Sequence, residues 1–299
     1  MEIKRVLLCG LGAVGLTYAC KLKDVCNLKI LADRSRVEKY LKIPPEFNDK
    51  KIHLDYITPD EKWCPDLIIV STKSQGLDSA IEYLENYVYD NTVILSLING
   101  ISSENKIADK YGRDKVLHSY FIGHSAVREK NKVTQDGIGK IVFGSPYPEN
   151  DFKVKMLAEF FENNHIDYEL SEDIIYSMWL KFALNVFSNQ VSAIMNLSFG
   201  ELKNPKLQNF AKKIIEEVAL IASKEGVKNT ENLEKDVLQS LSLMVDNGKT
   251  SMLQDILAGR KTEVDIFAGE ILRLGEKYNI QTPYNMIMYD MIKVLENKE

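Results

Sequence analysis

Cysteine is scarce in this sequence, and its distribution excludes the two structural uses that cysteine most often has. The chain has 299 residues but only four cysteines, all in its first quarter: Cys9, Cys20, Cys26 and Cys64. They show neither CxxC spacing nor a histidine ligand pattern, so neither a disulfide framework nor a bound metal is predicted. We expect free thiols, buried or half-buried, of the kind that a reducing compartment preserves, which makes the cytoplasm the expected location.

Glycine and proline are sparse as well, and long hydrophobic runs are absent. With sixteen glycines, eight prolines and 45% hydrophobic residues, the composition is that of an ordinary globular protein, and the length favours two domains. No apolar run reaches the ~20 residues that a membrane span needs. A basic start followed by the apolar stretch Val6–Cys20 imitates a secretory signal, but the three glycines within that stretch would weaken the helix of a signal, so export is not predicted.

Charge of one sign does not dominate the chain. Lysine and arginine number 38 and aspartate and glutamate 43, and the formal net charge of −5 is spread along the sequence. Without a long basic run the chain lacks the electrostatic footprint of a nucleic-acid binder. The partners expected are therefore small molecules, with neither nucleic acid nor membrane among them.

Short apolar runs alternate with helical patterns through the first half. This alternation predicts a mainly parallel sheet with helices between its strands. The expected strands are Ile3–Cys9, Leu28–Ala32, Asp66–Ser71, Thr92–Leu97 and Lys115–Ile122. The expected helices are Ser74–Tyr89 and Ser103–Tyr111. Beyond them Val127–Gln135 and Gly137–Phe143, separated at Asp136-Gly137, predict a hairpin that gives the sheet an antiparallel edge.

The pattern becomes helical after one more helix, at Asp151–Asn163, and a last short strand, at Ile166–Leu170. Ser171, followed by two acidic residues, is typical of a helix N-cap and marks the expected domain boundary. We therefore predict an α/β fold class, with a sheet domain over residues 1–170 and an all-helical domain over residues 171–299.

A glycine motif lies between the first expected strand and the helix after it. The residues Gly10, Leu11, Gly12, Ala13, Val14 and Gly15 match GxGxxG in the context that makes this weak motif useful. The first glycine permits a tight turn, the second lets the backbone approach a pyrophosphate, and the third allows close packing of helix on strand. The motif predicts a Rossmann-type dinucleotide-binding domain; the alternative is a glycine-rich turn without a ligand.

The second expected strand ends in residues that bear on the choice of dinucleotide. Asp33 stands 18 residues after Gly15, the last glycine of the motif, close to where an acidic side chain binds the ribose hydroxyls of NAD. Arg34 and Arg36 come next, and their guanidinium groups suit the extra phosphate of NADP. Both arginines are equally typical of solvated residues at the start of a surface helix, so NADP and NAD both stay open.

Two polar features follow the next two expected strands. Lys73 comes after the strand near residue 70, and Asn99-Gly100 comes after the strand that ends near residue 97. Ligands in open α/β sheets bind outside the carboxyl ends of the strands, so each of these residues is a candidate for contact with nicotinamide or substrate. A solvated lysine and an ordinary Asn-Gly turn are the alternatives.

One segment of the helical half, Met178–Phe199, is strongly apolar yet carries a lysine and several neutral polar side chains. At ~100° per residue these side chains fall within an arc of about 80°, so they share one face. They are Lys181, Asn185, Asn189, Ser192 and Asn196. Such a face suits the wall of a cleft, where asparagines bind carboxylate, carbonyl and hydroxyl groups and the lysine offers a charge and a proton. The alternative is a buried helix whose amides are satisfied by other helices.

A second polar patch lies at Thr250–Asp255 and Lys261–Asp265. Several of its side chains are candidates for the same cleft. Thr262 and Asp265 also fit the acidic variant of a capping box, which predicts the start of a helix there instead.

These residues together resemble one known family, the ketopantoate reductases (2-dehydropantoate 2-reductases), which make pantoate for pantothenate and coenzyme A. The resemblance runs nearly end to end and is far more specific than GxGxxG alone. Its features are Gly10–Gly15, Lys73, Asn99-Gly100, Trp179-Leu180-Lys181 with Asn185 and Asn189, Gly200-Glu201-Leu202, and Ser251-Met252-Leu253-Gln254-Asp255 with Thr262-Glu263.

The resemblance implies a role for each matching residue. Lys181 is implied as the proton donor, and Asn185, Asn189 and Ser251 as residues that hold the substrate. Glu263 is implied to complete the ternary site. Cofactor contacts are implied for Gly10–Gly15 and Lys73, with Asn99 between cofactor and substrate and Ala126 as a backbone contact. A homodimer is expected because helical second domains of such enzymes often pair.

The chain departs from that family at two clear places. Asp33 stands about where the family often has an arginine or a neutral residue near the adenosine phosphate. Phe199 replaces an asparagine often found near the end of the polar helix, and around Asn247-Gly248 the position of a matching asparagine is open. Cofactor preference and substrate contacts are therefore where differences are expected.

The hypothesis from the sequence is a nicotinamide-dependent reductase of a small 2-keto acid bound between the two domains. Hydride goes to the ketone carbon, while the Lys181 ammonium, charged at neutral pH, stabilises the developing charge on the oxygen and protonates it. Two alternatives stay open. One is a reductase of a different small 2-keto acid, and the other is a non-catalytic protein that senses a dinucleotide.

Overall fold

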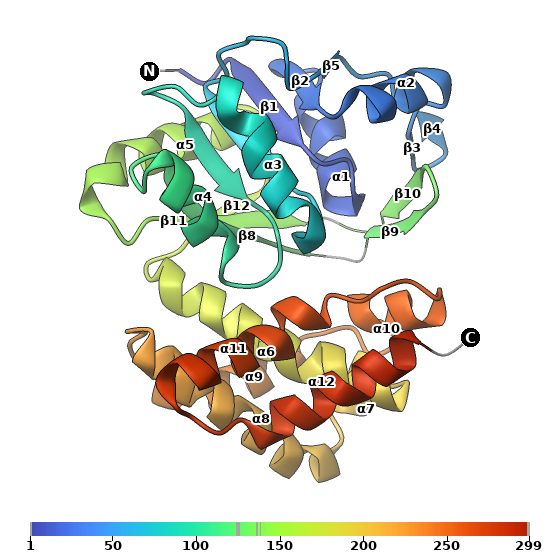
Figure 1. The fold of residues 1–299 in the computed structure, drawn as a ribbon, viewed down its shortest axis with the longest axis vertical. Helices are drawn as coiled ribbons and strands as arrows, with labels where there is room; N and C mark the ends of the chain where they lie inside the picture. Colours follow the sequence, from blue (N-terminus) through green and yellow to red (C-terminus); the bar gives the residue numbers. More distant parts are fainter. Residues whose placement is uncertain (1, 124–125, 136, 138, 298–299) are drawn as a thin grey trace. The chain divides into compact units, whose positions relative to one another are not determined.

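The computed structural model describes residues 2–123, 126–135, 137 and 139–297. By its internal contacts the chain divides into two compact units, Met1–Ile174 and Ile175–Glu299. In Figure 1 the first unit runs from blue to yellow-green and the second from yellow to red. Each unit is described by itself below, beginning with the sheet of the first.

The first unit is built on an eight-stranded sheet with the order β12-β11-β8-β7-β6-β1-β2-β5. Six neighbouring strands are parallel, and β11 pairs antiparallel with β8, so the predicted antiparallel edge is present as β11 with β12 beside it. The strands are β1 (Arg5–Cys9), β2 (Asn27–Leu31), β5 (Tyr56–Ile57), β6 (Leu67–Val70), β7 (Val93–Ser96), β8 (Val116–Ile122), β11 (Lys140–Gly144) and β12 (Tyr168–Leu170). The predicted fold class is confirmed, and its five early strands are present within a few residues.

The order of the strands creates a crevice where the chain changes direction. After β2 and β5 on one side of β1, the chain crosses to β6 on the other side, so the switch point lies between β1 and β6. Cys9 of β1 is in register with Val70 of β6 and with Leu31 of β2. The turns that follow these three strands therefore lie at one edge of the sheet, where open α/β sheets bind ligands.

Alternate side chains of the strands form two hydrophobic cores. One core joins the sheet to α1 (Ala13–Leu22) and α5 (Asp151–Asn163), and the other joins it to α3 (Leu77–Tyr83) and α4 (Ser103–Tyr111), the two helices drawn in front of the sheet in Figure 1. All four residues of β6 are buried. A continuous apolar strand of this kind is what a parallel sheet covered on both faces requires.

A second, smaller sheet has the order β4-β3-β10-β9 and lies beside α1 (Figure 1). Its strands are β3 (Glu46–Phe47), β4 (Lys50–Lys51), β9 (Ala126–Glu129) and β10 (Lys132–Gln135). The predicted hairpin was wrong in its pairing, because β10 pairs with β9 through a turn at Lys130-Asn131. Lys130 has a φ of 54° in that turn. Asp136, part of the predicted turn, lies outside the described residues. Two tertiary interactions decide the pairing against the turn sequence Asp136-Gly137. Val133 is buried in the core that includes α1, and β11 pairs with β8.

Two predicted helix boundaries also differ from the structure. The helix expected over 74–89 is broken into the 3-10 turn η1 (Ser74–Gly76), α3 and the 3-10 turn η2 (Leu84–Asn86). Gly76 has a non-helical conformation where the first turn meets α3, and glycine is a poor helix former. Ser171 is not an N-cap, because α6 begins at Ile174 and the Ser171 N–H instead donates to the carbonyl of Phe143.

The second unit consists of helices, and its described residues contain no strand. They include α6 (Ile174–Met195), α7 (Phe199–Leu202), α8 (Pro205–Lys224), α9 (Leu233–Ser242), α10 (Ser251–Leu257), α11 (Ala268–Tyr278) and α12 (Pro283–Glu296). Three further 3-10 turns are η3 (Pro148–Asn150) in the first unit and η4 (Thr230–Asn232) and η5 (Val264–Ile266) in the second. None of the helices over the described ranges has the length and apolarity that crossing a membrane demands.

The cysteines are all free, and three of them are buried or half-buried. Burial raises the pKa of the Cys9 thiol to about 12, so this group stays protonated and unreactive near neutral pH. Cys64 is exposed, which corrects the expectation that every thiol is at least partly buried.

His118 on β8 gives the first unit an expected dependence on pH. Its side chain is 8% exposed, and burial lowers its pKa to about 4. An unfolded histidine has a pKa of about 6.5, so below that pH the unfolded chain binds more protons. The free energy of unfolding should therefore fall by up to about 3 kcal/mol as the pH drops from about 6.5 to about 4, and stay at its full value above this window.

Urea unfolding of the wild type and of His118→Phe at about pH 7 and about pH 4.5 tests this expectation. Phenylalanine keeps a ring beside Tyr147, whose centroid lies 6.2 Å from that of His118, but cannot be protonated. The loss of stability on acidification should shrink in the variant. An identical loss in both proteins would mean that other groups dominate acid unfolding.

Candidate cofactor and active site

The glycine motif forms a turn that leaves no room for two of the three possible side chains. Gly10, directly after β1, has a φ of +107°, and a Cβ there would lie 2.7 Å from the backbone nitrogen of Thr72. A Cβ at Gly15 would lie 2.0 Å from the carbonyl oxygen of Gly10 and 2.6 Å from Oγ of Ser71. Internal packing at the crevice between β1 and β6 therefore requires glycine at both positions.

Gly12 differs from its two neighbours in the motif. A Cβ there would meet only the Ser71 carbonyl oxygen, at 3.7 Å, an ordinary contact. Gly12 is the N-cap position of α1, and no side chain caps that helix. Because the first N–H groups of a helix attract anions, this end of α1 is a suitable place for a phosphate, and the bare Gly12 backbone leaves space for it.

Side chains distant in sequence hold the turn in place. Ser71, buried at the end of β6, donates from Oγ to the carbonyl of Gly10 at 2.8 Å. Arg128 of β9 donates from Nη1 to the carbonyl of Leu11 at 2.6 Å. The side chains of Leu11, Ala13 and Val14 pack on the hydrophobic core, so the motif presents backbone rather than side chains at its open face.

The acidic residue and both basic residues after β2 form ion pairs. Asp33 is the N-cap of α2 (Arg34–Lys42), accepting a 2.9 Å bond from the N–H of Arg36 and a 2.6 Å bond from Oγ of Ser35. Partial burial acts to raise the pKa of the Asp33 carboxyl, but those bonds and the Arg36 guanidinium outweigh it and leave the pKa below its usual range. Arg34 pairs with Asp60 at 3.0 Å, with both side chains largely exposed.

The remaining cofactor candidates lie near the same edge of the sheet or on the small sheet. Lys73 is exposed and follows β6 directly before η1, and Asn99 is half-buried after β7. Since β6 and β7 are parallel neighbours, the turns carrying these two residues lie side by side. The backbone of Ala126 pairs with Gln135 at the start of β9, and its side chain lies outside the described ones.

In the second unit, hydrogen bonds join three of the predicted substrate residues. Nδ2 of Asn189 donates to Oδ1 of Asn185 at 3.0 Å, one turn earlier on α6. Oδ1 of Asn189 accepts from Oγ of Ser251 at 3.1 Å and from the N–H of Met252 at 3.2 Å. Lys181 is half-buried on α6, four residues before Asn185 and therefore on the same face.

This network fixes the first turn of α10. Thr250 caps the helix by accepting from the N–H of Leu253, while Asn189 accepts from the N–H of Met252. Two backbone donors at the helix start are thus satisfied by side chains. Only 5% of the surface of Asn189 is exposed, whereas Asn185 is half-buried. Asn185 is therefore the more accessible of the two amides.

The predicted polar face does not extend to the end of α6. Ser192 is fully buried and donates from Oγ to the carbonyl of Leu197, just beyond the helix. Asn196 lies past the last residue of α6 with a φ of 55° and is exposed. The Leu197 N–H donates to the carbonyl of Ser192, so the helix ends in a turn that satisfies this carbonyl and has Asn196 as its residue of positive φ.

The capping box expected at Thr262 was wrong. Thr262 is fully buried, and its N–H and hydroxyl both donate to Oε1 of Glu296 on α12. Asp265 accepts from the Tyr289 hydroxyl and pairs with Lys293 at 2.8 Å instead of capping a helix. Glu263, half-buried between these two, comes directly before η5.

The other motif residues of this unit are structural. Ser198 and Glu201 form a capping box at the start of α7, and a Cβ at Gly200 would lie 2.9 Å from Cβ of Asp246. Phe199 donates its N–H to the carbonyl of Gly248 at 2.9 Å, and its ring packs against that glycine. The ring at this position, where the resemblance implies an asparagine, has its described contacts with the loop at Gly248.

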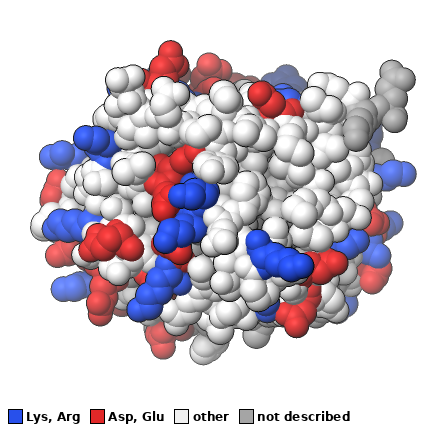
Figure 2. Space-filling view, turned by 90° about the horizontal axis from the view of Figure 1, so that it is seen from below, with Lys and Arg blue, Asp and Glu red and all other residues white. Residues whose placement is uncertain are grey.

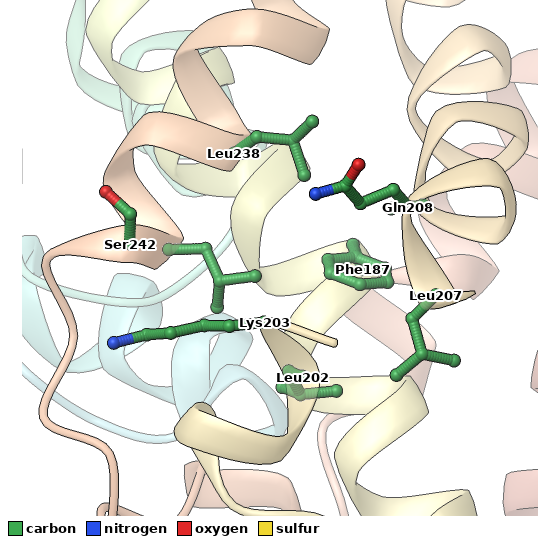
Figure 3. A pocket seen from close by; sticks show the side chains of 9 residues that line it. Phe187, Leu202, Lys203, Leu207, Gln208, Leu238 and Ser242 are labelled. Atoms are coloured by element: carbon green, nitrogen blue, oxygen red, sulfur yellow. The ribbon is translucent and has the colours of Figure 1, made fainter. Parts of the chain in front are cut away.

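A pocket of about 120 Å³ lies elsewhere in the second unit (Figure 3). Its lining comes from α6, α8, α9 and the end of α7: Phe187, Leu202, Lys203, Leu207, Gln208, Ala211, Leu238, Leu241 and Ser242. Phe187 is on the side of α6 away from Lys181 and Asn185. The ammonium of Lys203 binds the Met244 carbonyl and Asp246, so this mostly apolar pocket has little chemistry of its own.

On the molecular face shown in Figure 2, basic and acidic side chains are interspersed, and no broad area of one sign appears. Within the described ranges there is also no group of three or more His, Cys, Asp or Glu side chains that could hold a metal ion. Neither observation indicates a site other than the glycine turn and the polar face of α6.

The sequence analysis missed the roles of three residues that organise the site. Ser71 had a weak signal, a polar residue ending a buried apolar strand. Thr250 stood in the predicted patch but without its role as the cap of α10. Arg128 had no signal, because only the packing of the small sheet brings it to Leu11.

Comparison with known proteins places the two units in one family. Residues 6–147 match the family model described as ketopantoate reductase PanE/ApbA, and residues 173–296 match the one described as ketopantoate reductase PanE/ApbA C terminal.

Individual relatives agree over nearly the whole length. A 2-dehydropantoate 2-reductase of Pyrococcus horikoshii is 29% identical over 299 residues, covering 98% of this chain and 98% of the relative. One from Aquifex aeolicus is 25% identical over 303 residues, covering 98% and 97%. A solved ternary structure of D-mandelate dehydrogenase with NADH and anilino(oxo)acetate has the same fold, with a TM-score of 0.86, 21% identity and 98% coverage of both chains.

Proposed function

Because the chain belongs to the ketopantoate reductase family, we propose that it reduces 2-dehydropantoate to pantoate, in the biosynthesis of pantothenate and coenzyme A, with a reduced nicotinamide dinucleotide. The observation that carries the proposal is the α6 face, where Lys181 stands one turn before the hydrogen-bonded pair of Asn185 and Asn189. A protein that only sensed a dinucleotide would need no such face.

The residues of the first unit fit a dinucleotide. The uncapped start of α1, the turn at Gly10 and the Gly12 position open to a close approach together suit a pyrophosphate. Lys73 and Asn99 follow the two strands beyond and are proposed to reach the nicotinamide half. When bound, the reduced cofactor supplies the hydride.

The second unit is proposed to bind the keto acid and move the proton. The Lys181 ammonium stabilises the charge that develops on the ketone oxygen and donates a proton to that atom. Asn185 offers its Nδ2 hydrogens to the substrate, since its Oδ1 already accepts from Asn189. Asn189 positions Asn185 and α10 together, and Ser251, exposed at the start of α10, adds a hydroxyl. Glu263 is proposed to complete the ternary site.

NADPH is the proposed donor, with NADH as the alternative. Arg34 pairs with an exposed aspartate, and such surface pairs are worth only about 0–1 kcal/mol, so a cofactor phosphate can displace Asp60. Arg36 is tied to Asp33, and the Asp33 carboxylate would repel a phosphate bound beside it. The preference between NADPH and NADH depends on whether Arg34 attracts the extra phosphate of NADPH more strongly than the Asp33 carboxylate repels it.

The test is the loss of reduced-nicotinamide absorbance with purified protein and 2-dehydropantoate, run in parallel with NADPH and NADH. Turnover with NADPH supports the reductase and a phosphate at Arg34 or Arg36. Turnover only with NADH assigns the ribose site to Asp33. Absence of turnover with either, while the protein binds a dinucleotide, would overturn the substrate assignment.

Phenylglyoxylate, the 2-keto acid that corresponds to mandelate, is the comparison substrate in the same assay. It is chosen because D-mandelate dehydrogenase shares the fold and because Phe199 changes a family position. A higher kcat/KM for phenylglyoxylate than for 2-dehydropantoate would favour the alternative, a reductase of another small 2-keto acid.

We also propose a homodimer located in the cytoplasm. The helix α12 exposes an apolar stripe opposite its buried face, formed by Met286, Ile287, Met291 and Val294, each between 45% and 61% exposed. Large contiguous apolar patches on a protein surface often mark interfaces with other chains. Sedimentation equilibrium should give twice the 34.1 kDa mass of the chain, and Ile287→Lys should reduce it to the monomer mass.

A further inference from the structure

A single arginine connects the small sheet to the glycine-rich turn. Nη1 of Arg128 donates to the carbonyl of Leu11 at 2.6 Å, and Nε of the same guanidinium donates to the carbonyl of Lys130 at 2.9 Å. One nitrogen of the guanidinium thus binds its own hairpin, and another binds the glycine-rich turn. Leu11 lies between Gly10 and Gly12, so the contact is within the motif itself.

The position of Arg128 is fixed by the packing of the small sheet. Oγ1 of Thr17, on α1, donates to Oε1 of Gln135 at the end of β10, at 2.7 Å. Val133 of β10 is fully buried, and Phe47 of β3 packs against the same core. The sheet that carries Arg128 is therefore anchored on the helix that follows the turn.

The bond to Leu11 controls the orientation of one peptide group. A trans peptide is planar, and its C=O and N–H point in opposite directions. The Leu11 carbonyl and the Gly12 N–H belong to the same peptide, so a guanidinium that holds the carbonyl also fixes the direction of that N–H. A charge-assisted bond to the carbonyl polarises the peptide and makes its N–H a stronger donor.

Among the described residues, no carboxylate cancels the charge of Arg128. Its two partners are backbone carbonyls, and none of the carboxylates in the described ranges forms an ion pair with it. It adds a positive charge beside a helix start that has no side-chain cap. Both effects favour an anion at the turn.

We infer that Arg128 is a positioning residue for the pyrophosphate of the dinucleotide, acting through the Leu11–Gly12 peptide and through its charge. This inference rests on the proposed function, because it needs a dinucleotide at the turn. It assigns the small sheet a task in cofactor binding, a task that the glycine motif alone does not reveal.

Arg128→Gln and Arg128→Lys separate the two effects. Glutamine keeps an amide donor without the charge, and lysine keeps the charge without the planar fork. The Kd for NADPH, or for NADH if that is the dinucleotide bound, should rise about 10- to 100-fold in Arg128→Gln and less in Arg128→Lys, as expected for loss of a charge-assisted bond. The salt dependence of Kd should weaken in the glutamine variant only.

Kinetics distinguish positioning at the pyrophosphate from general damage. The KM for the dinucleotide should rise, while kcat at saturating dinucleotide and the KM for the keto acid stay near wild type. Arg113→Gln, which removes an exposed charge before β8 at the opposite end of the strands, is the matched control. It should leave Kd unchanged.

Three outcomes of these measurements would contradict the inference or the proposed function. If the wild type binds a dinucleotide and Arg128→Gln binds it equally well, or if Arg113→Gln loses as much affinity, the inference is overturned. If Arg128→Gln lowers the melting temperature of the ligand-free protein and raises the KM of both substrates, Arg128 is only structural and the inference is also overturned. If the wild type binds neither NADPH nor NADH, it is the proposed function that fails.

Discussion

Replacement of Lys181 by alanine is expected to reduce turnover of the keto acid by about 10²–10⁴-fold, the usual contribution of a general acid. The reason is that the ketone oxygen would lose both its proton donor and the positive charge that stabilises it in the transition state. The Kd for the reduced dinucleotide should stay near wild type, because the glycine motif is in the other unit. Steady-state kinetics and a fluorescence titration of the dinucleotide measure both quantities.

Two controls make the Lys181 result specific. Lys235→Ala removes an exposed lysine of α9 in the same unit and should leave kcat unchanged. Small primary amines added to Lys181→Ala should restore part of the turnover if the missing group is a proton donor. Near-normal turnover of Lys181→Ala would show that another group protonates the substrate.

Gly15→Ala and Gly12→Ala should fail in different ways, although both change a glycine of one motif. A Cβ at Gly15 would overlap the Gly10 carbonyl oxygen at 2.0 Å, so α1 must shift away from β1. We expect a loss of about 1–3 kcal/mol in the free energy of unfolding, the usual effect of overpacking, together with loss of dinucleotide binding.

Gly12→Ala should instead keep the stability of the wild type within about 0.5 kcal/mol, because its Cβ has an open position in the protein itself. Its Kd for the dinucleotide should nevertheless rise about tenfold or more, since the methyl group would stand where the pyrophosphate approaches. Urea unfolding and dinucleotide titration of the two variants supply the comparison. Unchanged affinity in Gly12→Ala would place the pyrophosphate elsewhere.

Most of the fold followed from local patterns. The apolar runs that became β1, β6 and β7 were recognisable because a strand covered on both faces is almost entirely apolar. The helices α4 and α5 have the predicted bounds. The hairpin was wrong because Asp136-Gly137 is a good turn sequence by itself, whereas the choice of partner for β10 depends on burial of Val133.

The residues of the candidate site could be predicted from the sequence, but the separate role of each residue could not. The periodicity of α6 placed Lys181, Asn185 and Asn189 on one face. It did not distinguish the accessible amide of Asn185 from that of Asn189, which is committed to the start of α10. Nor did it show that the Ser192 hydroxyl donates to the carbonyl of Leu197, just beyond the end of α6, because both arrangements have the same spacing.

The sequence by itself determined the fold class, the glycine turn after β1 and the polar face of α6, because each depends on residues close together in the chain. Tertiary structure alone decided which two glycines of the motif are required by internal packing, which asparagine is tied to α10, and that Arg128 reaches the carbonyl of Leu11. Those facts depend on contacts between segments distant in sequence, and such contacts are fixed only when the sheets and helices pack.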